Sequence, residues 1–195
     1  MVWNLPILLT WLRIFAIPAV VVLFEVGRAH PLGIADPSAG LLFAAASITD
    51  SLDGWLARRW KQTTALGAFL DPVADKLIVA AALVLLASRD PRLLLVNAAI
   101  VIVGREIAVS ALREWMAEIG QRARVGVSEL GKLKTILQMV GLTLLLYRHD
   151  WLGLPIYRIG MWFTVAAAVL TLLSMLDYLR AALPYLSGHP DDRGT

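Results

Sequence analysis

Cysteine is absent from all 195 residues of the chain, and charged residues are sparse. Without cysteine the protein can form neither disulfide bonds nor thiolate metal sites. Asp, Glu, Lys and Arg make up 17% of the sequence, whereas hydrophobic residues make up 58%, above the roughly 45–50% of an average soluble domain. The composition therefore predicts an integral membrane protein.

The sequence also lacks internal repeats, low-complexity tracts and any loop long enough to hold a soluble domain. We therefore expect one transmembrane domain over residues 1–195, with a flexible tail at about 187–195. Basic residues lie at the edges of apolar segments rather than together on one polar face. Nothing in this distribution indicates a nucleic-acid partner.

Six apolar segments are long enough to cross about 30 Å of hydrocarbon as α-helices. Turn-like or charged stretches such as RRWKQTT and AEIGQRARVGVS separate them. The predicted fold is an all-α integral membrane bundle of six transmembrane helices, at Leu5–Val26, Ala39–Arg58, Leu66–Ala87, Leu93–Trp115, Leu130–Tyr147 and Ile156–Leu183.

The distribution of Lys and Arg predicts the orientation, because these residues are enriched in cytoplasmic loops. The connection after the second segment contains Arg58, Arg59 and Lys61, and the one after the fourth contains Arg122 and Arg124. The connections on the other side hold fewer basic residues. We expect the even-numbered segments to exit on the cytoplasmic side, which also places both termini in the cytoplasm.

The first apolar segment begins near Met1 and carries Arg13 in its middle. It has no basic stretch before it and no clean cleavage site after it, so we expect a retained span rather than a removed signal peptide. Two interpretations of Arg13 stay open. Its guanidinium either snorkels toward a helix end or faces a polar site inside the bundle.

Four aspartates lie at the end of the second apolar segment and the start of the third, in the stretch DSLDGWLARRWKQTTALGAFLDPVAD. Asp50 and Asp53 are three residues apart and Asp71 and Asp75 are four apart, so each pair shares one helix face. A carboxylate inside a bilayer costs at least a few kcal/mol, which makes a functional role the first hypothesis. Antiparallel packing of two such helices would bring the four acids together near the cytoplasmic side.

Carboxylates held close together repel one another unless they are protonated or neutralised by cations. Oxygen ligands of this kind select hard ions such as Mg²⁺, Mn²⁺ or Ca²⁺. Two alternatives use no metal: Asp50 pairs with Arg58, or Asp71 caps a helix whose first residue is Pro72. A metal site explains both pairs at once, because small residues back each pair on the same stripe.

This pattern resembles the signature of the CDP-alcohol phosphatidyltransferase family. Bacterial members that use sn-glycerol 3-phosphate as the acceptor are similar over further stretches, which include ARRWKQTTALGAFLDPVADKL, GREIAVSALREWMAEIG and GKLKTILQM. The similarity extends from Asn4 to about Leu146. Every fixed position of the signature is filled at the expected spacing: Asp50, Asp53, Gly54, Ala57, Arg58, Gly67, Asp71 and Asp75.

The resemblance implies a homodimer in the bacterial inner membrane, with a polar cavity open to the cytoplasm. It also implies a reaction in which CDP-diacylglycerol and sn-glycerol 3-phosphate give phosphatidylglycerophosphate and CMP. Two divalent ions, Mg²⁺ or Mn²⁺, would assist this reaction. Membrane lipids are the remaining expected partners.

The resemblance further assigns roles to the matching residues. Asp50, Asp53 and Asp71 would hold the metal ions, and Asp75 would act as general base toward the C1 hydroxyl of the acceptor and as a further metal ligand. The CDP-lipid would bind against Gly54, Ala57, Arg58 and Gly67. The glycines also fit an alternative role in close helix packing.

The phosphate of the acceptor requires cations, and four basic residues outside the acidic stretch are candidates. Arg105 lies inside an apolar segment beside Glu106, where phosphate capture and a simple internal ion pair are both open. Arg113 lies eight residues later on much the same helix face. Lys132 and Lys134 stand at the start of the fifth segment, where they either bind the phosphate or anchor the helix at the cytoplasmic surface.

Two other functions are open on the sequence. The same chemistry can use another acceptor, such as inositol phosphate, serine or a lipid. Acids inside a membrane can also line an ion path, which would make the protein a divalent-cation transporter. Transport alone gives no reason for the small residues and the arginine between the two acid pairs.

Overall fold

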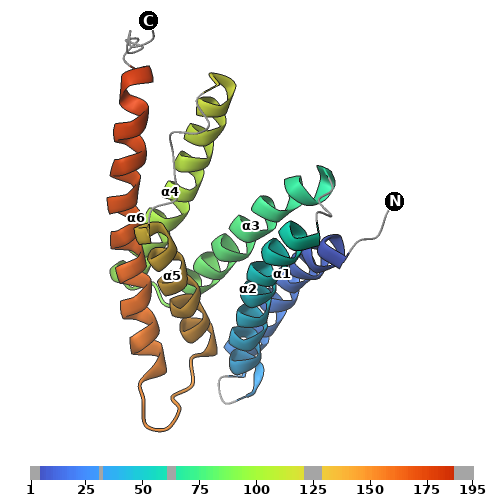
Figure 1. The fold of residues 1–195 in the computed structure, drawn as a ribbon. Helices are drawn as coiled ribbons and strands as arrows, with labels where there is room; N and C mark the ends of the chain where they lie inside the picture. Colours follow the sequence, from blue (N-terminus) through green and yellow to red (C-terminus); the bar gives the residue numbers. More distant parts are fainter. Residues whose placement is uncertain (1–4, 31–32, 61–64, 121–128, 187–195) are drawn as a thin grey trace, which may run out of the picture.

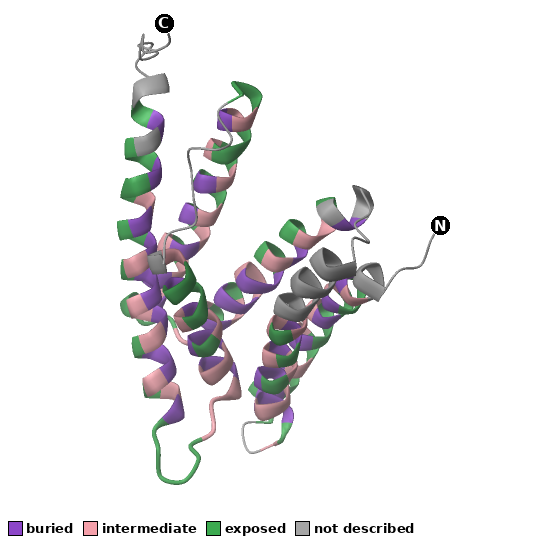
Figure 2. Cartoon of the chain, viewed as in Figure 1, coloured by how far each residue is buried: buried purple, intermediate pink, exposed green. Residues whose placement is uncertain are grey.

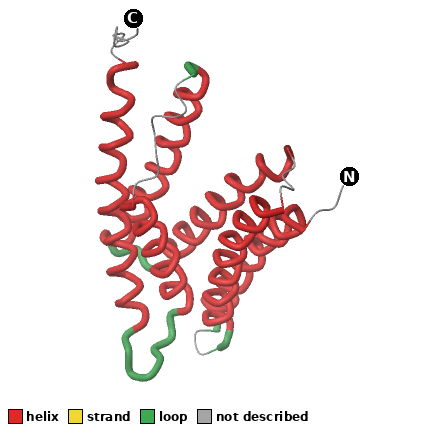
Figure 3. The backbone as a smooth tube through the Cα atoms, in the orientation of Figure 1, coloured by secondary structure: helices red, strands yellow, loops and turns green. Residues whose placement is uncertain are grey.

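The computed structural model describes residues 5–30, 33–60, 65–120 and 129–186. Side chains are described for these residues except at positions 5–8, 50–60, 65, 66, 68, 129, 130, 181 and 184–186. The described ranges form helices joined by loops (Figure 3). The helices are α1 (Leu5–Ala29), α2 (Ala35–Trp60), α3 (Ala65–Arg89), α4 (Leu93–Glu118), α5 (Glu129–Tyr147) and α6 (Ile156–Leu186).

The six apolar segments of the sequence therefore become six helices, and their predicted boundaries are close. The largest difference is at the start of α2, which begins at Ala35 rather than Ala39. The helices run alternately up and down (Figure 1). We call the end of the bundle where α2, α4 and α6 finish the terminal end, and the end where α1, α3 and α5 finish the turn end.

The helices pack in two groups that share one apolar core (Figure 1). α1 lies along α2 and α3, whereas α6 lies along α4 and α5. Contacts of α2 with α5 and of α3 with α4 join the two groups. The largest buried apolar side chains come from α1 to α5 and include Phe24, Phe43, Leu83, Leu86, Leu95, Ile102, Leu142 and Leu145.

α5 and α6 approach each other closely where two glycines face. A Cβ atom on Gly160 would lie 2.9 Å from the carbonyl oxygen of Gly141, and one on Gly141 would lie 2.9 Å from the backbone nitrogen of Thr164. Both distances are shorter than side-chain carbons tolerate. The two backbones are therefore in direct contact, as small residues permit between membrane helices.

Three helices are long and apolar enough to cross a membrane, within the described residues: Leu9–Ala29, Leu93–Glu118 and Ile156–Arg180. The outer surface supports a lipid environment, because Phe15, Ile100 and Trp162 are 67%, 65% and 63% exposed (Figure 2). α3 carries Asp71, Asp75 and Lys76 close together, which lowers its hydropathy, and the described side chains cover only part of α2 and of α5. The structure is that of a membrane protein, and crossing by all six helices stays a prediction.

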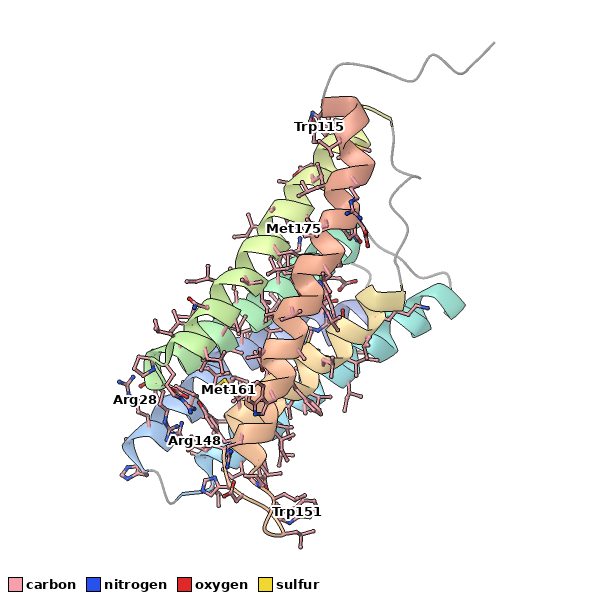
Figure 4. All side chains as sticks on the ribbon, turned by 90° about the vertical axis from the view of Figure 1, so that its left-hand side faces the viewer. Arg28, Trp115, Arg148, Trp151, Met161 and Met175 are labelled. Atoms are coloured by element: carbon pink, nitrogen blue, oxygen red, sulfur yellow. The ribbon has the colours of Figure 1, made fainter. Side chains whose placement is uncertain are left out.

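Interfacial side chains mark the two ends of the bundle. Trp115 lies near the terminal end, whereas Arg28, Arg148 and Trp151 lie at the turn end (Figure 4). Tryptophan and arginine are favoured where a membrane meets water. α1 begins at Leu5 and α6 ends at Leu186 toward this terminal end (Figure 1).

A buried ion pair ties three helices together at the turn end. Two nitrogens of Arg89 on α3 contact the two carboxylate oxygens of Asp36 on α2, at 2.6 and 3.0 Å. The same guanidinium donates to the carbonyl oxygen of Gly27 on α1 at 3.2 Å. Because Asp36 is 1% exposed, this bidentate pair satisfies a charge that water does not reach.

Candidate active site

Two of the four aspartates of the sequence pattern have described side chains, and both lie on α3. Thr10 on α1 donates a hydrogen bond from Oγ1 to Oδ1 of Asp71 at 2.5 Å. One turn along each helix, a guanidinium nitrogen of Arg13 contacts Oδ1 of Asp75 at 2.8 Å. The spacing of three residues on α1 thus matches the spacing of four on α3, and the two helices hold the acids side by side.

The contact of Arg13 decides between its two interpretations. Its side chain is 2% exposed, so it does not snorkel toward a helix end. It faces the acid pair, and the side chain of Asp75 remains 37% exposed. Asp71 is not a helix cap, contrary to one alternative, because α3 begins at Ala65 and contains Pro72.

The donor atoms of this acid pair fit a hard divalent ion. Thr10 and Arg13 each contact Oδ1 of their partner, so both carboxylates are held with their oxygens between α1 and α3. Carboxylate oxygens are the donors that Mg²⁺ and Mn²⁺ prefer. Among the described side chains no group of three or more His, Cys, Asp or Glu residues forms. The other predicted ligands, Asp50 and Asp53, lie on α2 with side chains outside the description.

The predicted nucleotide-binding residues are described only in part. Gly67 lies buried in the first turn of α3, one turn before Asp71. Gly54, Ala57 and Arg58 lie on the last three turns of α2, and their side chains are outside the description. The predicted alternative in which Asp50 pairs with Arg58 also lies outside the described side chains.

A second polar cluster joins α4 and α5. Glu106 accepts two hydrogen bonds through its Oε1, from Arg105 at 3.1 Å and from Lys134 at 3.0 Å. Arg105 and Lys134 are 8% and 5% exposed. The internal Arg–Glu pair predicted as one alternative therefore exists, but one carboxylate serves two buried cations.

α6 contributes two residues to this cluster that the sequence did not reveal. Arg105 donates from Nη2 to the hydroxyl of Ser174 at 3.2 Å, and Arg113 donates from Nη2 to the hydroxyl of Tyr178 at 2.5 Å. A signal for them does exist. The polar residues Thr164, Thr171, Ser174 and Tyr178 fall on one face of an otherwise apolar helix.

Lys132 does not share the position of Lys134. Residues two apart on a helix point to different faces. Lys134 is buried against Glu106, whereas Lys132 is exposed. The structure thus brings together Arg105, Arg113 and Lys134 of the four predicted cations.

The acid pair and the basic cluster lie at similar depth in the bundle. Lys76, which follows Asp75 on α3, and Glu106 on α4 line one pocket between these helices. Three cations against one carboxylate give the basic cluster a net charge of +2. The acid pair with Arg13 has a net charge of −1. The arrangement separates negative and positive groups, as needed to bind a cation on one side and an anion on the other.

A third cluster lies at the turn end, away from these groups. Arg92 contacts Asp90 with its Nη2 at 2.5 Å, and the hydroxyl of Tyr157 also donates to Asp90. The hydrogen bonds from Arg92 hold the pKa of Asp90 at about 2, against the opposing effect of burial and with help from Tyr157. This carboxylate therefore stays ionised through the physiological range.

Comparison with known proteins confirms the resemblance seen in the sequence. The model of the CDP-alcohol phosphatidyltransferase family matches residues 3–173. A CDP-diacylglycerol–glycerol-3-phosphate 3-phosphatidyltransferase of Salmonella choleraesuis is 48% identical over 182 residues, which cover 93% of this chain and 96% of the relative. Proteins of the same name from Shigella flexneri serotype 5b and Escherichia coli K12 are each 47% identical, with the same coverage. The chain belongs to the CDP-alcohol phosphatidyltransferase family.

Proposed function

We propose that the protein transfers the phosphatidyl group of CDP-diacylglycerol to the C1 hydroxyl of sn-glycerol 3-phosphate, giving phosphatidylglycerophosphate and CMP. The names of its relatives support the two substrates. The observation in this chain that carries the proposal is an acid pair on α3 together with a buried basic cluster of net charge +2, where Lys76, next to Asp75, and Glu106 of the cluster line one pocket.

The acidic side of the site serves the CDP-lipid. Family membership supports use of a divalent metal, and we assign Asp50, Asp53, Asp71 and Asp75 as the residues that hold two Mg²⁺ or Mn²⁺ ions. A metal held by these residues would supply positive charge against the pyrophosphate. Thr10 keeps Asp71 in one orientation, because its hydroxyl occupies Oδ1. Gly54, Ala57 and Gly67 leave space for the nucleotide, and Arg58 supplies a cation for its phosphates.

Asp75 is the general base in this proposal. Arg13 contacts Oδ1 and orients the carboxylate, which accepts the proton of the C1 hydroxyl. The hydroxyl oxygen forms a bond with the β-phosphorus of CDP-diacylglycerol, and the bond from that phosphorus to the CMP oxygen breaks. Because the side chain of Asp75 is 37% exposed, it is accessible to a second substrate.

The basic side of the site serves the acceptor. The phosphate of glycerol 3-phosphate is a dianion near neutral pH, and the cluster of Arg105, Arg113, Lys134 and Glu106 has the opposite net charge. The planar guanidinium of Arg105 suits bidentate phosphate binding. Lys132, exposed at the start of α5, is assigned to attract the acceptor rather than to seat it.

The proposal places the enzyme in the bacterial inner membrane, with six spans. The terminal end of the bundle, both termini and a polar cavity that admits the acceptor face the cytoplasm. The basic residues beyond α2 and α4 support this side as cytoplasmic. The chain acts as a homodimer, as the resemblance to the family implies.

A CMP-release assay with purified protein in detergent tests the function. CDP-diacylglycerol and Mg²⁺ are supplied with glycerol 3-phosphate, inositol phosphate or serine as acceptor. We expect CMP release with glycerol 3-phosphate above all others, and a preference for another acceptor would overturn the substrate assignment. Cation flux in liposomes without CMP release would instead establish a transporter.

Two variants test the acidic side separately. Asp71→Ala should abolish CMP release and weaken Mn²⁺ binding, because it removes a ligand. Asp75→Asn should abolish turnover and leave binding of CDP-diacylglycerol largely intact, since the amide cannot accept the proton. Normal turnover in Asp75→Asn would exclude it as the base.

A further inference from the structure

Tyr178 on α6 lies between the two arginines of the basic cluster. The guanidinium carbon of Arg105 is 5.3 Å from the centre of its ring, and that of Arg113 is 5.1 Å from it. Both distances are within the range of a cation–π contact. The ring is 9% exposed, so both contacts lie in a largely dry environment where they are strong.

The hydroxyl of Tyr178 adds a directional contact. It accepts a hydrogen bond from Arg113 and therefore keeps its own proton for another acceptor. In the described part of the chain, no acceptor for that proton is recorded. An anionic oxygen held between the two arginines would satisfy it.

Side chains of α6 and α4 orient Arg105. Ser174, one turn before Tyr178, accepts from its Nη2, and Glu106 accepts from its Nη1. Its Nε is buried and has no hydrogen-bond partner among the described residues. A buried donor without a partner costs free energy unless a ligand or water supplies an acceptor. The guanidinium is thus fixed in place while its Nε–H still needs an acceptor.

We propose that Tyr178 is a specificity-determining residue for the acceptor phosphate: its ring sets the positions of Arg105 and Arg113, its hydroxyl proton is donated to a phosphate oxygen, and Ser174 seats Arg105. This rests on the proposed function, since it concerns the acceptor site of that reaction. The ligand class is a phosphomonoester dianion, which can use two guanidinium groups and a hydroxyl donor together. Tyr178 thus has two roles: its hydroxyl contacts the acceptor phosphate, and its ring positions the two arginines.

The chain contains a matched control for this arrangement. Tyr157, at the other end of α6, has the guanidinium groups of Arg92 and Arg148 at 5.6 and 5.2 Å from its ring centre, and its hydroxyl donates to Asp90. The two tyrosines are 21 residues apart, or about 31 Å at 1.5 Å per residue. Met161 and Met175 mark the course of α6 between them (Figure 4). Tyr157 therefore has the same kind of contacts far from the acid pair.

The experiment measures CMP release for the wild type, Tyr178→Phe, Tyr178→Leu, Tyr157→Phe and Tyr157→Leu, with Mg²⁺ and both substrates varied. Inorganic phosphate, as a competitor of glycerol 3-phosphate, reports on the phosphate subsite alone. We expect Tyr178→Leu to raise the acceptor KM and the Ki of phosphate together by about tenfold, from the loss of two cation–π contacts and a hydrogen bond. Tyr178→Phe keeps the ring and should raise both by about threefold.

The KM for CDP-diacylglycerol should change less than twofold in every variant, and both Tyr157 variants should keep the wild-type acceptor KM. An unchanged acceptor KM and phosphate Ki in the Tyr178 variants would overturn the inference, as would an equal rise in the Tyr157 variants. If Tyr178→Leu does not fold, the phosphate Ki of Tyr178→Phe decides. Absence of CMP release by the wild type with glycerol 3-phosphate would instead refute the proposed function.

Discussion

Replacement of Arg13 by Gln should remove the contact of α1 with Asp75, and the size of the lost coupling follows from the geometry. The guanidinium lies 2.8 Å from Oδ1 of Asp75, and its side chain is 2% exposed. Two unit charges about 4 Å apart attract by about 4 kcal/mol at an effective dielectric constant of about 20. The cost of burying the guanidinium offsets part of this attraction, and water at the 37% exposed side chain of Asp75 screens another part. We expect a net coupling of about 1–3 kcal/mol.

A double-mutant cycle measures this coupling. Arg13→Gln, Asp75→Asn and the double variant are unfolded in detergent with EDTA present, so that bound metal does not mask the change. The exposed pair Asp177–Arg180, at 3.9 Å with side chains 59% and 76% exposed, provides the control cycle. Its coupling should stay below about 0.5 kcal/mol. A coupling for Arg13 and Asp75 no larger than that of the control would refute the reasoning.

Activity gives a second readout on the same residues. If Arg13 positions Asp75, Arg13→Gln should lower kcat by about 10²-fold and leave both KM values within about twofold, because a misplaced base weakens only the chemical step. Arg13→Lys keeps the charge and should restore part of kcat. A rise in KM without a fall in kcat would instead place Arg13 in substrate binding.

Three further changes test the fold and its electrostatics. Asp90→Asn should remove a pH-dependent part of the stability, because the pKa of Asp90 is lowered to about 2 in the folded protein. The contribution of Asp90 is complete above about pH 4 and is lost as the pH falls toward 2. The melting temperature of the variant should therefore depend less on pH across that window than that of the wild type. Gly160→Leu should destabilise the α5–α6 contact by at least about 2 kcal/mol in detergent unfolding, because the new side chain meets backbone at 2.9 Å. Arg89→Met should cost about 3–5 kcal/mol by leaving Asp36 buried and unpaired, and Arg89→Met with Asp36→Leu should recover most of it.

The helices were predictable from sequence because apolar length alone locates them. Each predicted segment became a helix, and α4, α5 and α6 start within one residue of the prediction. The number of spans is a harder inference. Hydropathy counts every charge as a cost, yet Lys134 of α5 and Asp75 of α3 are compensated by partners on other helices. Within the described residues, a measure based on composition accepts α1, α4 and α6, whereas α3 carries too many charged residues for it.

The partners of the site residues were beyond sequence reasoning for a different reason. Periodicity shows that Asp71 and Asp75 share a face, but not which helix meets that face. Arg13 is 62 residues away from Asp75 in sequence. Tyr178 belongs to an apolar helix whose few polar residues are weak signals, and only the packing of α4 on α6 brings it to Arg105.

The two polar clusters share a design that accounts for their stability in an apolar bundle. Each contains one group of the opposite sign: Arg13 among the acids and Glu106 among the cations. Arg13 ties α1 to Asp75 of α3, and Glu106 of α4 binds Lys134 of α5, so each joins two helices while it neutralises part of the charge. Among the described side chains, neither neutralises all of it. The charge that remains, negative beside α1 and positive beside α6, is unfavourable in a low-dielectric bundle unless ligands compensate it. A metal-bound pyrophosphate on one side and a phosphate dianion on the other would supply that compensation. Binding of the two substrates should therefore stabilise the folded protein more than binding of either alone.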